Sequence, residues 1–282
     1  MIYYRDTGCV AEPEEYQKGV VTFLYETIPG RFLLGLAVSC WFSSFYGAYY
    51  RSPLSRRSIR PFVQKHGIPM GEEELESYRS FREFFTRKKE VTAQTKDPKA
   101  LLAVADSKMR YYPITEDLRL TIKNSVYDLA DILEDEALAE SYRGGTCLVF
   151  RLGMEDYHRY HYLDDGCLVL SKKIPGVLHT VRSLSEKYRV FARNSRKVSV
   201  LRTAHFGQVV QVEVGALLVG RIQDRGARDF VRMEEKGYFD FGGSTILVLL
   251  NKEVCFDEDI VKMNDAGVEI QVFAGERIGH LC

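Results

Sequence analysis

From residue 101 onward the chain is a series of short apolar runs with period-two alternation, separated by turn residues. This alternation is typical of β-strands that place one face in a core. One helix-like segment with an acidic centre, Val126–Leu138, interrupts the series. The runs that predict strands are Leu101–Ala105, Cys147–Leu152, Leu168–Leu170, Val198–Leu201, Val209–Val219 and Thr245–Leu250. We therefore expect an α+β protein whose body is a mostly β sandwich or barrel.

The first hundred residues have a different pattern, which predicts helices. A short amphipathic helix is expected over Glu14–Thr27, and another helix over Glu72–Phe85. Between them, the nineteen residues of Phe32–Tyr50 carry no charge, and this length could just span a bilayer. The serines, glycines and aromatic residues of this segment are more typical of a helix that lies in the headgroup region.

The next segment, Arg51–Lys65, carries five cations and no acid. Basic residues beside an aromatic segment are attracted to anionic lipid by about 1 kcal/mol per charge near the surface. We interpret residues 1–65 as a helical, membrane-associating region and residues 66–282 as the main domain. The alternative is a buried helix followed by a solvated basic helix.

Composition narrows the class of protein. Formal net charge is zero, which argues against a nucleic-acid binder. The six cysteines are scattered and form no C-x-x-C pair, so we expect reduced thiols in a cytosolic setting. Charged residues interrupt the first thirty positions, so no cleavable signal is expected. The predicted location is peripheral, on the cytoplasmic face of the cell membrane.

A Gly-Gly-Ser-Thr stretch, residues 242–245, lies directly before the last predicted strand. Gly243 has no Cβ, so another group can approach its carbonyl closely. The hydroxyl of Ser244 lies next to that carbonyl and can attack the preceding peptide bond if a base removes its proton. By itself, the stretch is more simply a turn or bulge before a buried strand.

Two other segments carry groups suited to acid–base chemistry. Asp106 ends an apolar run and alone would be an ordinary turn acid. His158 and His161 lie three residues apart in an acidic and aromatic context. Such a pair can share a metal ion, but no cysteine is placed to complete a ligand set, so acid–base use fits better and no metal is expected. On a strand, residues three apart point to opposite faces, so the histidines share a site only if the backbone turns.

A third segment, Phe191–Arg196, contains two arginines. Arg193 and Arg196 could form a phosphate or carboxylate site, because guanidinium groups bind such anions in a bidentate manner. A solvated hairpin turn explains the segment equally well.

In their order along the chain, these motifs resemble the phosphatidylserine decarboxylase proenzyme family. The resemblance covers roughly residues 30–282. The Asp-Tyr-His-Arg-x-His block and the Gly-Ser-Thr are together highly specific. The matching motifs are Ser52–Arg57, Phe84–Arg87, Asp106, Asp156–His161, Phe191–Arg196, Phe206-Gly207, Val214–Ala216, Gly243–Thr245 and Gly275–Gly279.

The resemblance implies that the chain cleaves itself. His161, oriented by Asp106, would take the proton from Ser244 Oγ, and the alkoxide would attack the carbonyl carbon of Gly243. β-Elimination would break the resulting ester, and loss of ammonia would leave a pyruvoyl group derived from Ser244. The products would be a β chain ending at Gly243 and an α chain of residues 244–282, which stay associated.

The resemblance also implies the reaction of the mature enzyme. The pyruvoyl carbonyl would form a Schiff base with the amine of phosphatidylserine in an anionic membrane and accept electrons as CO2 leaves. His158 would return a proton to Cα, and phosphatidylethanolamine would be released. Tyr157, Arg193 and Arg196 are candidate substrate-binding residues. The oligomeric state stays open, a homodimer included.

Three positions depart from the family pattern. Ser107 replaces the glycine that usually follows the aspartate, Gly242 replaces a leucine, and Ser195 replaces a glutamate. None of these changes removes a chemical role. Two alternatives remain: a relative that decarboxylates a free amino acid, and an uncleaved β-fold protein that only binds a partner.

Overall fold

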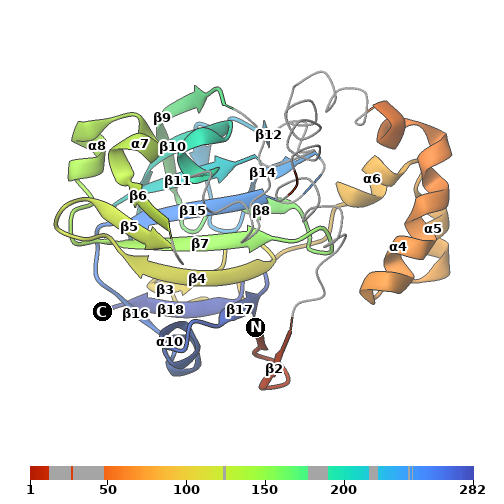
Figure 1. The fold of residues 1–282 in the computed structure, drawn as a ribbon, viewed down its shortest axis with the longest axis horizontal. Helices are drawn as coiled ribbons and strands as arrows, with labels where there is room; N and C mark the ends of the chain where they lie inside the picture. Colours follow the sequence, from red (N-terminus) through yellow and green to blue (C-terminus); the bar gives the residue numbers. More distant parts are fainter. Residues whose placement is uncertain are drawn as a thin grey trace.

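The structure is a computed structural model that describes residues 1–12, 27, 48–122, 125–176, 190–215, 222–240, 242 and 244–282. A ten-stranded sheet forms its centre (Figure 1). In spatial order its strands are β13 (Asp229–Phe230), β9 (Gly166–Ile174), β10 (Arg196–Thr203), β11 (Gln208–Val214), β15 (Ser244–Leu250), β7 (Thr146–Leu152), β4 (Ser107–Pro113), β17 (Glu269–Val272), β1 (Ile2–Tyr4) and β2 (Cys9–Ala11).

Three smaller sheets and several short helices complete the described part. The sheets are β12 (Ile222–Asp224) with β14 (Glu235–Phe239) and β8 (Arg159–His161), then β16 (Val254–Phe256) with β18 (Arg277–Leu281) and β3 (Ala100–Leu102), and β5 (Arg119–Ile122) with β6 (Ser125–Asp128). The helices are η1 (Pro53–Ser58), α4 (Ile59–His66), α5 (Glu72–Ser77), α6 (Phe81–Phe85), α7 (Leu129–Leu133), α8 (Glu136–Glu140), α9 (Val190–Arg193) and α10 (Glu258–Asp265).

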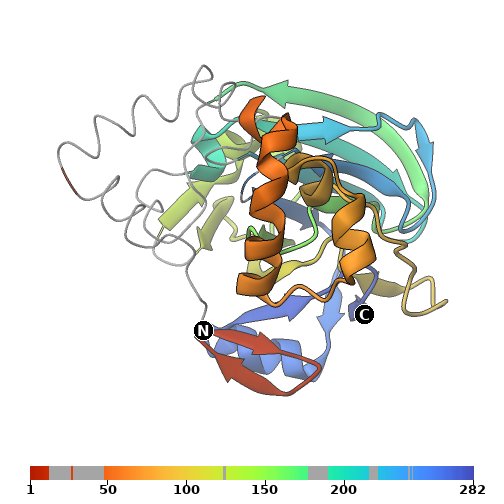
Figure 2. The same cartoon turned by 90° about the vertical axis from the view of Figure 1, so that its right-hand side faces the viewer.

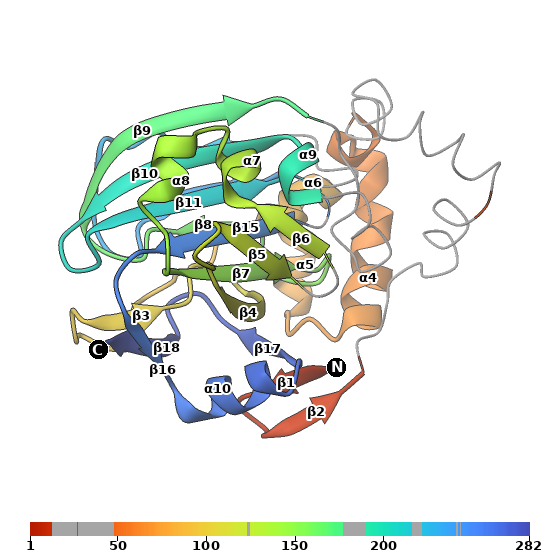
Figure 3. The same cartoon turned by 60° about the vertical axis from the view of Figure 1, so that its left-hand side comes forward.

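Both faces of the large sheet are covered, because every residue of β15 is buried. Ile246 and Val248 face a core shared with β8 and β14, whereas Leu247 and Leu249 face a second core under α7 and α8 (Figure 3). Residues at alternate positions of a strand share a face. Ser244 therefore lies on the same face as Ile246, toward the small sheet of β8 and β14.

Helices α4, α5 and α6 form a separate layer at one side of the sheet (Figures 1 and 2). They have their own apolar core, in which Phe62, Phe81 and Phe84 pack edge to face. Arg82 of α6 forms a two-point ion pair with Asp240, four residues before Ser244. The helical layer is thus tied to the segment that leads into β15.

The strand predictions are largely confirmed. The runs Cys147–Leu152, Leu168–Leu170, Val198–Leu201 and Thr245–Leu250 lie within β7, β9, β10 and β15. Strand β3 ends at Leu102, three residues before the predicted end. Strand β11 ends at Val214, and residues 216–219 of that prediction lie outside the described residues.

Two helix predictions are confirmed only in part, because each segment contains two short helices in place of one. The helix expected over 72–85 is broken by extended backbone at Tyr78, and Ser80 begins α6 by accepting a hydrogen bond from Glu83 N–H. The segment 126–138 begins as strand β6 and then forms α7 and α8, separated by Glu134 in left-handed backbone. Aspartates at both N-caps accept main-chain hydrogen bonds, so local capping outweighs the helical periodicity.

The N-terminus joins the large sheet, which the sequence did not predict. Strand β1 pairs in parallel with β17 and in antiparallel with β2, so residues 2–11 belong to the β body (Figure 3). The helix predicted over 14–27, save Thr27, and residues 32–47 of the uncharged segment lie outside the described residues. Across the part of the chain that is described, no helix combines the length and apolarity needed to cross a membrane.

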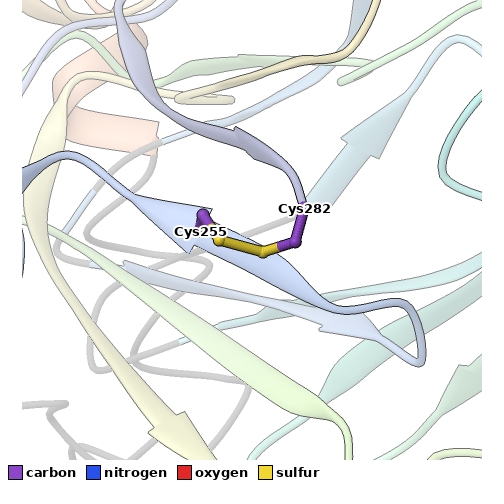
Figure 4. The surroundings of a disulfide bond; sticks show 2 residues. All are labelled: Cys255 and Cys282. Carbon is purple, nitrogen blue, oxygen red and sulfur yellow. A yellow bond between two sulfur atoms is a disulfide. The ribbon is translucent and has the colours of Figure 1, made fainter.

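The expectation that all cysteines are reduced is wrong for one pair. Cys255 and Cys282 form a disulfide, with their Cα atoms 5.4 Å apart (Figure 4). Pairing of β16 with β18 brings Cys255 opposite His280, next to the chain end. Sequence spacing gave no sign of this pairing, because a separation of 27 residues resembles no short motif. Both cysteines lie after Ser244.

Candidate active site

Ser244 is the first residue of β15 and is fully buried. Its Oγ has no hydrogen-bond partner among the described residues. It lies opposite Leu152 of β7, and continuing the β4–β7 register places Ser107 beside Leu152. Neighbouring strands lie about 4.8 Å apart, so the ends that carry Ser244 and Asp106 are roughly 10 Å apart. Gly243 lies outside the described residues.

His158 lies next to this row of strand ends. Its Nε2 donates to the carbonyl oxygen of Gly153 at 2.7 Å, and Gly153 directly follows the partner of Ser244 on β7. The imidazole stacks on Phe85 with a centroid distance of 4.2 Å. A carbonyl can only accept, so Nε2 carries the hydrogen and Nδ1 is an acceptor. Nδ1 is buried and has no partner in the described chain.

The pKa of His158 is lowered to about 3, mainly because the ring is buried. The hydrogen bond to the Gly153 carbonyl raises this pKa, but by less than burial lowers it. His158 is therefore neutral at pH 7, with a free lone pair on Nδ1. Its main-chain carbonyl accepts from Phe239 N–H at 3.0 Å, which links it to the strand leading toward Ser244. The region thus contains a buried hydroxyl and a buried imidazole nitrogen, both unpartnered.

His161 is buried at the end of β8 and contacts Val104. Its main-chain N–H donates to the Val104 carbonyl at 2.9 Å, and its Nδ1 lies 3.3 Å from the same oxygen. Burial lowers the pKa of His161, while the Val104 carbonyl and the carboxylates of Glu235 and Asp106 raise it. Asp106 therefore lies near enough to His161 to influence its charge.

Asp106 itself has other hydrogen-bond partners. One carboxylate oxygen pairs with Lys89, and the other accepts from Ala274 N–H at 2.8 Å. The described contacts show no hydrogen bond between Asp106 and His161. The structure orients the ring of His161 through the Val104 carbonyl instead, because that carbonyl already lies against Nδ1.

A buried lysine supports the loop before His158. Lys108 Nζ lies 2.8 Å from Asp156 and 2.5 Å from Glu155, and Asp156 also accepts from Gly153 N–H at 2.7 Å. Burial raises the pKa of Asp156 to about 6, despite the lysine. This network fixes Gly153, the residue whose carbonyl holds His158.

The candidate substrate-binding residues lie in different places. The hydroxyl of Tyr157 accepts from Lys89 N–H at 3.0 Å, next to Asp106. Arg196 is in register with Val214 and, through it, with Thr245, so it lies on the face opposite Ser244. Its guanidinium donates to main-chain carbonyls of α7 and its surroundings, and Arg193 is exposed. These contacts assign Arg196 a structural role.

Sequence reasoning missed an ion pair on the face of Ser244. Glu213 and Lys236 are both fully buried, and Lys236 Nζ donates to Glu213 Oε1 at 2.9 Å. The available signal was the acid within the apolar run Val212-Glu213-Val214. An acid at a position that alternation assigns to the core is unusual, because a buried carboxylate needs a partner.

Known proteins resemble this chain over most of its length. The family model described as "Phosphatidylserine decarboxylase" matches residues 81–280. A protein named "Phosphatidylserine decarboxylase proenzyme 2" from Clostridium acetobutylicum is 44% identical over 99% of this chain and 97% of the relative. A protein named "Phosphatidylserine decarboxylase proenzyme" from Ruminiclostridium cellulolyticum is 39% identical over 91% of this chain and 89% of the relative. A protein of the same name from Desulfitobacterium hafniense is 37% identical over 84% of this chain and 83% of the relative. The chain therefore belongs to the phosphatidylserine decarboxylase family.

Proposed function

We propose that the protein converts phosphatidylserine to phosphatidylethanolamine and CO2, with a pyruvoyl group formed from Ser244. The observation that carries the proposal is the buried, unpartnered Oγ of Ser244 at the start of β15. The imidazole of His158, whose Nδ1 is also unpartnered, is held by Gly153, the residue after the β7 partner of Ser244. A hydroxyl that forms no hydrogen bond with the surrounding chain is free to act as a nucleophile. The residues present fit the group, because it is made from the chain itself.

Self-cleavage would occur between residues 243 and 244. His161 takes the proton from Ser244 Oγ, and Asp106 stabilises the charge that His161 then carries. The cut leaves a β chain of residues 1–243 and an α chain of residues 244–282. Strand β15 keeps the chains together, because it pairs along its length with β7 and β11.

In the mature enzyme the pyruvoyl group supplies an electron sink for the loss of CO2. His158 relays the proton that returns to the substrate carbon, because its Nδ1 lone pair can accept a proton and then pass it on. Its neutral state keeps one ring nitrogen bonded to Gly153 and leaves the other to exchange protons. Stacking on Phe85 fixes the ring and excludes water from one of its faces.

The two histidines can be separated by experiment. His158→Ala should still cleave but should decarboxylate poorly, whereas His161→Ala should remain a single chain. Denaturing gels measure cleavage and lipid analysis measures decarboxylation. A His158→Ala protein that stays uncleaved would show that His158, whose loop adjoins Ser244, is the base for cleavage.

Membrane contact would come from the N-terminal part of the helical layer, and we place the functional boundary near residue 65. Leu54 and Tyr49 are 65% and 45% exposed, and Arg57 and Arg60, close by in the sequence, are also exposed. Exposed apolar groups next to cations suit an anionic lipid surface. The protein then binds the cytoplasmic face of the membrane that contains its substrate.

Turnover on lipid vesicles tests the proposed function. Vesicles of phosphatidylserine in phosphatidylcholine should yield phosphatidylethanolamine with the wild-type protein and none with Ser244→Ala. Activity on free serine or another free amino acid, with none on vesicles, would favour the soluble-substrate relative. A wild-type protein inactive on both substrates would overturn the enzymatic proposal.

A further inference from the structure

Glu213 carries a buried carboxylate oxygen that the chain leaves unpaired. Its Oε1 accepts from Lys236, whereas its Oε2 has no partner among the described residues. Asp106, Asp156 and Asp240, which are also buried acids near Ser244, have donors on both oxygens. A buried carboxylate oxygen without a donor is costly, so Oε2 is suited to receive one from a ligand.

Glu213 lies on the same face of the sheet as Ser244. It is directly opposite Ile246, two residues along from Ser244. Such diagonal neighbours have Cα atoms about 7–8 Å apart, within reach of a glutamate side chain. Continuing the register places Gly215 opposite Ser244, and Asn194 holds the Gly215 carbonyl at 2.7 Å. Glycine has no side chain, so position 215 places only backbone next to Ser244.

A network of charges fixes the carboxylate in place. Lys236 donates to both Glu213 and Asp224, and Lys197 pairs with Asp224 at 2.6 Å. The four side chains are all less than a tenth exposed and contain two acids and two bases, so their formal charges cancel. Burial raises the pKa of Glu213, which favours proton acceptance. Glu213 is therefore a rigid, buried acceptor close to the reacting residue.

We propose that Glu213 Oε2 binds the primary ammonium group of the substrate and accepts its proton. This inference rests on the proposed function, since the amine reacts at the carbonyl that Ser244 supplies. The proton moves to Oε2, and the freed lone pair on nitrogen forms the new bond to the carbonyl carbon. The two remaining N–H protons leave with the carbonyl oxygen as water, so atoms and charge balance.

Glu213→Gln tests the proposal, because glutamine keeps the shape and the Lys236 contact but cannot take the proton. Cyanoborohydride reduces the Schiff base that phosphatidylserine forms with the α chain and so makes the bond permanent. The intact mass of the α chain then measures how much phosphatidylserine has been trapped. We expect normal self-cleavage and trapping slowed on the order of 10²-fold. Hydroxylamine, uncharged at neutral pH, should label both proteins at the same rate, since it needs no deprotonation. Glu213→Asp, which keeps the charge, should recover part of the trapping rate.

Glu269→Gln is the matched control, since Glu269 is ion-paired with Arg151 on the opposite face of the same sheet. It should trap phosphatidylserine at the wild-type rate. Equal trapping by Glu213→Gln and wild type would overturn the inference. The inference would also be overturned if Glu213→Gln slowed hydroxylamine labelling as much as it slowed trapping, because Glu213 would then have a structural role. Loss of self-cleavage in Glu213→Gln would overturn it as well, by assigning Glu213 to maturation. A wild-type chain that fails to cleave would instead refute the proposed function.

Discussion

His158 makes the stability of the precursor depend on pH, and the size of the effect follows from its burial. An unfolded histidine has a pKa near 6.5, whereas burial lowers the pKa of His158 to about 3. Between these values the unfolded chain binds a proton that the folded chain does not, so stability falls as pH falls. Because the unfolded histidine is half protonated at pH 6.5, lowering the pH from 6.5 to 4.5 corresponds to a loss of about 2 kcal/mol.

Urea unfolding of the Ser244→Ala precursor, which stays one chain, measures this loss. His158→Gln in the same background retains a donor for the Gly153 carbonyl but has no group that titrates. We expect its free energy of unfolding to fall by about 2 kcal/mol less than that of the parent between pH 6.5 and 4.5. His280→Gln, at an exposed position, is the control for loss of a histidine. Equal pH dependence in parent and His158→Gln would refute the reasoning.

Three further changes test the support around the site. Lys108→Met should lower the free energy of unfolding by about 3–5 kcal/mol, because it leaves Asp156 buried without its cation. Adding Asp156→Asn should recover part of this loss, and no recovery would contradict the pairing of Lys108 with Asp156. Gly237→Ala should lower the Tm, since the added Cβ would lie 2.1 Å from the carbonyl oxygen of Gln223. An unchanged Tm would show that β12 can shift away from the added methyl group at no cost. Dithiothreitol should lower the Tm of wild type but not that of Cys282→Ser, because the disulfide contributes about 3 kcal/mol to the free energy of unfolding. An equal change in the Tm of both proteins would argue against the disulfide.

Much of the β body could be predicted because its strands carry a local signal. Every residue of β15 is buried, and its apolar run predicted a strand that begins within one residue of the observed start. Helices were harder to predict, since capping by Ser80 and extended backbone at Tyr78 outweigh the periodicity of 72–85. The parallel pairing of β1 with β17 joins the two ends of the chain, and local periodicity carries no information about such pairing.

The candidate site shows the same division. Ser244, His158 and Asp106 could be selected from residue type and motif order. The partner of Asp106 could not, because Lys89 reaches it from a segment with no regular pattern. The position of Glu213 depends on the register of β11 against β15, which forms only in the folded sheet.

Intact mass of the purified protein tests the central claim most directly. We expect two chains separated after residue 243, with an α chain lighter by one ammonia than residues 244–282 and an N-terminus closed to Edman degradation. Ser244→Ala should give one chain with the full mass. A wild-type protein that remains a single chain, or an α chain that begins with an unmodified Ser244, would contradict the account.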